Sequence, residues 1–161
     1  MGESAMALRH ERPTSILFSE PLLKNMQNLV DWFISPRTQA SSMRILFVCV
    51  GNTCRSQMAQ AAARHMGHEA ESAGTHPGAA IAANAIKVTS ELGIEMEDQY
   101  PKSIDEIDTT GFDRIISMGC GVECPMLPID EDWGLDDPVG REEEIYRTTL
   151  NDILSRIEAL G

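Results

Sequence analysis

The sequence has no long apolar run and few positive charges. Among its 161 residues, no uninterrupted apolar stretch approaches the roughly 20 residues that a membrane-spanning helix needs. Only 13 lysines and arginines stand against 25 aspartates and glutamates, which gives a net charge of −12. A surface this acidic repels phosphate backbones. We therefore expect a soluble protein with neither a membrane nor a nucleic acid as partner.

The start of the chain also lacks the basic, apolar and small-residue order of a secretory signal, so we expect a cytoplasmic protein. Its four cysteines form two close pairs, Cys49 with Cys54 and Cys120 with Cys124. Cytosolic thiols stay reduced, which favours reactive cysteines over structural disulfides. Zinc binding by the four thiols is the alternative. An arginine beside the first pair has no use in a zinc site, so we predict no metal.

Residues 1–42 differ from the rest of the chain. They carry four basic and four acidic residues, so the whole net charge lies in residues 43–161. Apolar residues recur at helical spacing between positions 19 and 33, which predicts one amphipathic helix, and residues 35–42 (SPRTQASS) are typical of a linker. We predict an N-terminal extension over residues 1–42 and a compact domain over 43–161. The extension is either a mis-assigned start with a loosely docked helix or a partner-binding segment.

Strand and helix patterns alternate through the second part. The predicted strands cover residues 44–50, 69–73 and 112–118, and the predicted helices cover residues 57–66, 80–92 and 141–160. This alternation predicts an α/β domain with a parallel sheet flanked by helices. Domains of this class bind their ligands at the carboxyl ends of the strands.

The segment CVGNTCRS, residues 49–56, lies between the first predicted strand and the first predicted helix. A loop there can turn its backbone N–H groups inward and, with the helix N-terminus, hold a tetrahedral oxyanion. Arg55 adds a planar fork for two oxygens, and the same field stabilises a thiolate at Cys49. We predict that Cys49 is a nucleophile; a buried structural cysteine is the alternative. The predicted oxyanion-binding residues are Val50, Gly51, Asn52, Thr53, Cys54, Arg55 and Ser56.

CVGNTCRS resembles the catalytic loop of the low-molecular-weight tyrosine phosphatases and of the arsenate reductases that share their fold. The resemblance covers about residues 43–160. It implies a doubly wound four-stranded parallel sheet, with Cys49 as nucleophile and Arg55 as oxyanion clamp. It also implies that Asn52 and Ser56 support the loop.

The resemblance also implies a general acid. In both branches of this family, an aspartate directly before a proline protonates the leaving oxygen, and Asp137 precedes Pro138 here. Without the resemblance, a solvated acidic turn is the alternative, because further acidic residues lie close by.

Phosphate and arsenate share charge and shape, so the loop alone does not separate the two enzymes. The phosphatases usually have proline after the Arg-Ser of the loop and aromatic residues after the Asp-Pro. This sequence has Gln57 at the first place and Val139-Gly140 at the second. Gln57 matches the reductase pattern, and the missing aromatic residues remove the surface on which a phosphotyrosine ring would stack. The sequence thus favours a reductase; a tyrosine phosphatase and a non-catalytic oxyanion-binding module are the alternatives.

The second cysteine pair supports this preference, because reduction of arsenate takes two electrons. Glycines on both sides of Cys120 leave it free to move towards Cys49. The implied sequence is attack of Cys49 on arsenate, protonation by Asp137, attack of Cys120 on Cys49, and resolution by Cys124. By analogy, Cys54 is a bystander or protective thiol.

The spacing of the second pair leaves the reductant open. Thioredoxin-coupled reductases generally place their two relay cysteines further apart than Cys120 and Cys124, and the GCGVECP segment also resembles a branch that uses an external thiol. We expect a monomer without a bound cofactor. Thioredoxin, glutaredoxin or a small thiol would then supply the electrons.

Overall fold

A computed structural model describes residues 42–119 and 127–161 of the chain. The helix predicted between positions 19 and 33 lies outside the described residues. The division of the chain at residue 42 therefore stays a prediction.

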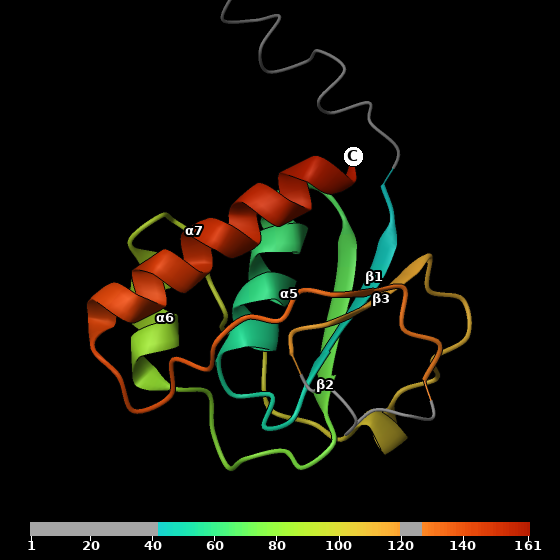
Figure 1. The fold of residues 1–161 in the computed structure, drawn as a ribbon, viewed down its shortest axis with the longest axis horizontal. Helices are drawn as coiled ribbons and strands as arrows, with labels where there is room; N and C mark the ends of the chain where they lie inside the picture. Colours follow the sequence, from blue (N-terminus) through green and yellow to red (C-terminus); the bar gives the residue numbers. More distant parts are fainter. Residues whose placement is uncertain (1–41, 120–126) are drawn as a thin grey trace, which may run out of the picture. The chain divides into compact units, whose positions relative to one another are not determined.

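Four parallel strands form one sheet in the spatial order β2-β1-β3-β4 (Figure 1). The strands are β1 (Arg44–Cys49), β2 (Glu69–Gly74), β3 (Arg114–Ser117) and β4 (Glu131–Asp132). The chain places β2 on one side of β1 and then crosses to place β3 on the other side. Such a reversal creates a crevice at the carboxyl end of β1, where open parallel sheets bind their ligands. The predicted four-stranded parallel sheet is confirmed.

Three α-helices accompany the sheet. They are α5 (Arg55–His65), α6 (Ala83–Ser90) and α7 (Glu143–Leu160), and a short 3₁₀ helix, η1, covers Ile104–Glu106. The three predicted helices are confirmed, although α5 begins two residues earlier than the pattern indicated and α6 begins at residue 83 instead of 80. Gly93, with φ of +77°, follows α6 as expected for a helix stop. In the described part of the chain, no helix is both long and apolar enough to cross a bilayer.

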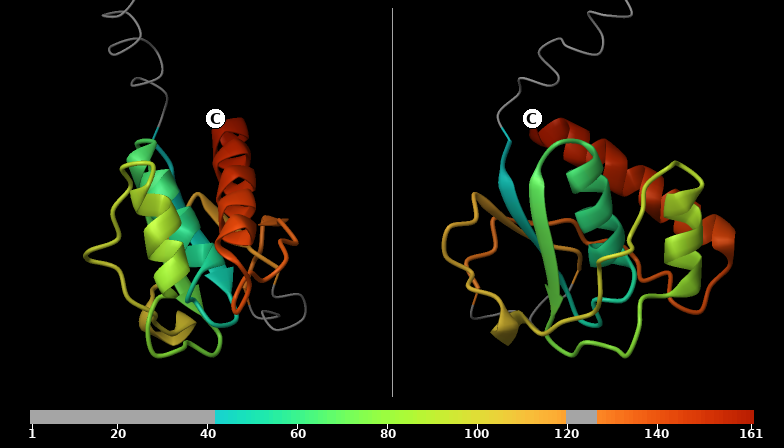
Figure 2. Two further views of the ribbon diagram at one scale, coloured as in Figure 1. Left: turned by 90° about the vertical axis from the view of Figure 1, so that its left-hand side faces the viewer. Right: turned by 180° about the vertical axis from the view of Figure 1, so that it is seen from behind.

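Strand β1 is buried on both faces. Ile45 and Phe47 pack in one apolar cluster with side chains of all three helices, whereas Leu46 and Val48 pack in a second cluster with residues around η1 and the loops. Figure 2 shows α5 beside β2, and α7 lies close to α5. Each fully buried aliphatic or aromatic side chain contributes about 1.5–3 kcal/mol. The central strand therefore gives the loop that follows it a rigid base.

Candidate active site

The loop between β1 and α5 has a compact backbone that only certain residues allow. Asn52 has φ of +52°, the left-handed conformation that asparagine tolerates better than most residues. Gly74, at the end of β2, packs directly against the loop, because a Cβ atom there would lie 2.5 Å from the Val50 carbonyl oxygen. Asparagine therefore suits this position, and β2 holds the loop from the side.

The Cys49 side chain is a buried free thiol at the end of β1. Its Sγ atom accepts a hydrogen bond from the Asn52 backbone N–H, with N and Sγ 3.0 Å apart, and lies 2.8 Å from Ser56 Oγ. Asn52 Nδ2 donates to the same Ser56 oxygen at 2.8 Å. Asn52 and Ser56 therefore contact the predicted nucleophile and each other, as the resemblance implied.

Arg55 is the first residue of α5 and is only 7% exposed. Its Nη1 atom donates to two backbone carbonyls, that of Met118 at 3.2 Å and that of Leu135 at 2.7 Å. Its Nε atom is buried and has no hydrogen-bond partner among residues 42–119 and 127–161. A buried, charged donor without an acceptor is costly. An oxyanion oxygen in the loop would satisfy Nε while the two carbonyls keep the guanidinium plane in place.

Gly119 makes room for this arrangement. It has φ of +124°, and a Cβ atom built there would lie 3.1 Å from Arg55 Nη1 and 3.1 Å from the Leu135 carbonyl oxygen. The sequence explained this glycine only by the freedom it gives to Cys120. The structure adds a packing reason, because any side chain at this position would press on the arginine and on its acceptor.

Asp137 reaches the loop from the segment before α7. Its Oδ2 atom lies 3.6 Å from Arg55 Nη2, its Oδ1 atom accepts from the Val139 N–H at 3.1 Å, and the Cys54 thiol contacts Oδ1 at 3.5 Å. The side chain remains 54% exposed, so it can exchange protons with water. The structure thus brings together the predicted nucleophile loop, the clamp and the proposed proton donor.

Cys54 differs from Cys49 in its surroundings. Burial, with the negative charge of Asp137 as the second cause, raises the pKa of the Cys54 thiol from 9.0 to about 12. Cys54 therefore stays a neutral thiol near pH 7 and donates its hydrogen to Asp137 Oδ1. This contact was not expected from the sequence, which by analogy made Cys54 a bystander or protective thiol.

The raised pKa of Cys54 predicts a loss of stability at alkaline pH. Because the folded state disfavours the thiolate, its contribution to stability is present below about pH 9 and is lost as the pH rises towards 12. Between pH 9 and pH 10.5 we expect the raised pKa of Cys54 to lower the free energy of unfolding by about 2 kcal/mol. Urea denaturation at the two pH values would measure this, with Cys54→Ala as the comparison: the variant should lose less stability over the same interval. Equal losses in both proteins would contradict the assignment.

Comparison with known proteins places these features in one family. The model of the family "Low molecular weight phosphotyrosine protein phosphatase" matches residues 44–124. The chain belongs to this family. It is 35% identical over 130 residues to the glutaredoxin arsenate reductase of Synechocystis sp., covering 73% of this chain and 95% of that protein. It is 40% identical over 138 residues to an arsenate reductase of Bacillus licheniformis, covering 73% and 94% of the two chains.

A solved structure of the family shows the same fold. It is described as an arsenate reductase in the phosphate binding state, has 34% sequence identity and a TM-score of 0.67, and the match covers 73% of this chain and 95% of that one. The resemblance that CVGNTCRS indicated is therefore confirmed at the level of the family and the fold.

Two of the predicted site residues, Cys120 and Cys124, lie outside the described residues. Their relay therefore stays a prediction. Within residues 42–119 and 127–161, no three His, Cys, Asp or Glu side chains gather as metal ligands would. The zinc alternative also involves Cys120 and Cys124, which lie outside these ranges, so it stays an alternative.

The supporting roles of two glutamines were not predicted from the sequence. Gln57 is fully buried and contacts Asn52, and Gln99 reaches Gln57 from 42 residues further along the chain. Gln57 was noted only for its match to the reductase pattern. Nothing local in the sequence marks Gln99, because its role comes from a contact across the fold.

Proposed function

We propose that this protein is an arsenate reductase that converts arsenate to arsenite with electrons from thiols. The observation that carries the proposal is the geometry of the loop of residues 49–56. Its cysteine sulfur accepts a hydrogen bond from a backbone N–H, and the buried Nε of its arginine has no hydrogen-bond acceptor among the described residues. The loop suits both phosphate and arsenate, because the two tetrahedral oxyanions share charge and shape. Similarity to arsenate reductases over 73% of the chain favours arsenate.

The first step joins sulfur to arsenic. The Cys49 thiolate attacks arsenate, an S–As(V) bond forms, the bond from arsenic to one hydroxyl breaks, and that hydroxyl leaves as water. Asp137 supplies the proton for that oxygen. Arg55 Nε and Nη2 are positioned to bind the remaining charged oxygens, whose charge they neutralise while the bond forms.

The second step moves two electrons. A second thiolate, which we propose is Cys120, attacks the sulfur of Cys49, and a disulfide forms. The electron pair of the S–As bond passes to arsenic, which leaves as arsenite, As(III). Cys124 then displaces Cys49 and forms a Cys120–Cys124 disulfide, so that Cys49 returns as a thiolate.

An external reductant must then reopen the disulfide. The Synechocystis relative is named a glutaredoxin arsenate reductase, which supports a glutaredoxin or small-thiol route; thioredoxin is the other donor that we consider. We further propose a monomeric, cytoplasmic enzyme, with the catalytic domain over residues 43–161 and the extension outside the reaction.

The test is arsenate-dependent NADPH oxidation by the full chain with two coupled systems. One contains thioredoxin and thioredoxin reductase, and the other contains glutathione, glutaredoxin and glutathione reductase. Turnover in either establishes arsenate reduction. Cys124→Ser distinguishes the routes: it should abolish turnover if the internal relay operates and preserve it if an external thiol attacks the adduct. Absence of turnover in both systems would contradict the proposed function.

A phosphatase remains the second candidate, because Cys49, Arg55 and Asp137 also suit hydrolysis of a phosphate ester through a phosphocysteine. The family is named for this activity. Val139, half-exposed directly after Pro138, offers no ring to stack on a phosphotyrosine. Hydrolysis of p-nitrophenyl phosphate without arsenate reduction would favour this candidate.

Replacing Asp137 by asparagine isolates the proton donor. Asparagine keeps the shape and can still accept the Val139 N–H through its oxygen, but it has no acidic proton to give. We expect kcat for arsenate reduction to fall by about 10²-fold or more. Steady-state kinetics would measure the loss, with the exposed neighbour variant Asp136→Asn as control. Equal kcat values for the two variants would remove Asp137 from its assigned role.

A further inference from the structure

A connected set of side-chain amides lies beneath the anion loop. Gln99 Nε2 donates to Gln57 Oε1 at 2.8 Å and to the Gln57 backbone oxygen at 3.0 Å. Gln57 is fully buried and Gln99 is 9% exposed. Because they lie 42 residues apart in sequence, this pair fastens the segment before η1 to the first turn of α5.

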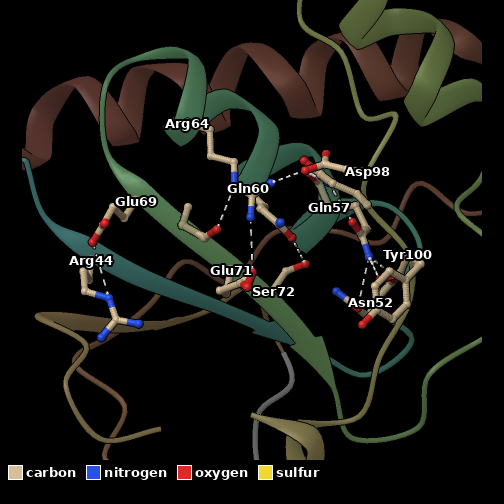
Figure 3. Close-up of polar contacts among 12 residues, drawn as sticks. Arg44, Asn52, Gln57, Gln60, Arg64, Glu69, Glu71, Ser72, Asp98 and Tyr100 are labelled. Carbon is tan, nitrogen blue, oxygen red and sulfur yellow. Dashed lines mark hydrogen bonds and ion pairs between the residues drawn. The ribbon is translucent and has the colours of Figure 1, made fainter. Parts of the chain in front are cut away.

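The orientation of the Gln57 amide is fixed by what surrounds its nitrogen. Nε2 lies 3.0 Å from each of three oxygens: the Asn52 carbonyl, Asn52 Oδ1 and the Tyr100 carbonyl (Figure 3). Backbone carbonyls can only accept hydrogen bonds. This end of the amide must therefore be the NH₂ group, so the other end, Oε1, faces Gln99 and must accept.

The orientation of Asn52 follows in the same way. Its Oδ1 atom accepts from Gln57 Nε2 at 3.0 Å and from the Lys102 backbone N–H at 2.9 Å. A backbone N–H can only donate, so this end is the oxygen. Asn52 Nδ2 consequently points at Ser56 and donates to its hydroxyl oxygen at 2.8 Å.

The last link joins Ser56 to Cys49. Ser56 Oγ accepts from Asn52, and its own hydrogen can point at Cys49 Sγ, 2.8 Å away. When Cys49 is ionised its sulfur can only accept, so Ser56 and the Asn52 N–H then both donate to it. Backbone groups of Tyr100 and Lys102 orient the amides of this chain, and Gln99 holds its first member in place.

We propose that Gln99 is a positioning residue that holds Gln57 at the start of this hydrogen-bond chain and so supports the two donors that bind the thiolate of Cys49. It touches neither the substrate nor the sulfur and acts through Gln57, Asn52 and Ser56. The proposal rests on Cys49 being the nucleophile of the proposed function. It extends the site to a segment that the sequence did not connect with it.

The test measures thiolate formation directly. Gln99→Glu keeps the shape but replaces the NH₂ donor by a carboxylate, which cannot donate to Gln57 Oε1. If the Gln57 amide rotated to compensate, its oxygen would face three acceptors. We expect alkylation of Cys49 by iodoacetamide at pH 6.5 to slow about tenfold, because less of the thiolate is present. Peptide mass spectrometry locates the modified cysteine.

Two further variants distinguish loss of the hydrogen-bond chain from a general effect of added negative charge. Gln60→Glu introduces the same charge on α5, the helix that Gln99 contacts, and there Gln60 Oε1 accepts from Ser72 Oγ, which a carboxylate can still do. It should react like wild type. Gln99→Met fills the site without a donor or a charge and should also slow the reaction. Slowing in Gln99→Glu with a wild-type rate in Gln99→Met would indicate charge repulsion and overturn the proposal.

Thermal melting accompanies both Gln99 variants, so that reactivity is compared between folded proteins. A wild-type alkylation profile in a folded Gln99→Met protein overturns the proposal even if Gln99→Glu does not fold. Alkylation does not depend on arsenate. Unchanged profiles in an enzyme that reduces arsenate would remove the role of Gln99 alone, whereas the expected shifts without arsenate turnover would remove the proposed function alone.

Discussion

Replacing Cys49 by serine is expected to abolish arsenate reduction, with a loss of about 10⁴-fold or more in kcat. A serine hydroxyl at this position can still accept from Ser56 and from the Asn52 N–H, and its size matches the buried site. It does not ionise near neutral pH, however, and it has no sulfur to join in a disulfide. Both the attack on arsenate and the electron transfer are therefore lost.

Binding and turnover should separate in this variant. Arg55 and the loop backbone are untouched by the substitution, so calorimetry should detect arsenate or phosphate binding close to that of wild type. Cys54→Ser is the matched control, because a serine there keeps a hydrogen-bond donor for Asp137. We expect it to retain most activity. Full activity in Cys49→Ser would refute the mechanism.

Arg55→Lys is expected to lower kcat/KM for arsenate by about 10²–10³-fold. Lysine keeps the positive charge but has a single nitrogen, which cannot bind the Met118 and Leu135 carbonyls and the anion together. It also lacks the Nε donor that is unpaired in this structure. Initial rates over a range of arsenate concentrations would measure the loss, and calorimetry would show weaker oxyanion binding.

The control for this substitution is Arg156→Lys on α7, where the arginine side chain is 40% exposed and pairs with Asp152 one helical turn away. Exposed pairs of this kind contribute little, so kinetics and stability should stay close to wild type. Undiminished oxyanion affinity in Arg55→Lys would show that charge alone holds the anion. The planar fork would then have no special role.

The loop was predictable because its signals are local. A buried strand, the tolerant residue at Asn52, Arg55 and the start of a helix occur within thirteen consecutive residues, and each has one physical meaning in that order. The resemblance to a family then supplied Asp137, which pattern alone would have left as a solvated turn. The structure places it 3.6 Å from Arg55 Nη2.

Long-range contacts were not predictable. The carbonyls that hold Arg55 come from residues 63 and 80 positions further along the chain, and backbone atoms leave no mark in side-chain patterns. Gln99 has the same difficulty. Strand β4 escaped notice because it has only two residues, too few for an alternating pattern. The missed features are those that depend on which segments meet.

The two carbonyls that fasten Arg55 have a consequence for how this enzyme diversifies. Met118 and Leu135 are also joined to each other, because the Leu135 N–H donates to the Met118 oxygen at 3.0 Å. The stretch of sequence between them contains both cysteines of the proposed relay. We therefore expect that changes in the length and cysteine spacing of that stretch leave the arginine in place, because the Leu135–Met118 hydrogen bond closes its base. A relative with a different electron donor can then keep the same arginine and the same oxyanion-binding loop.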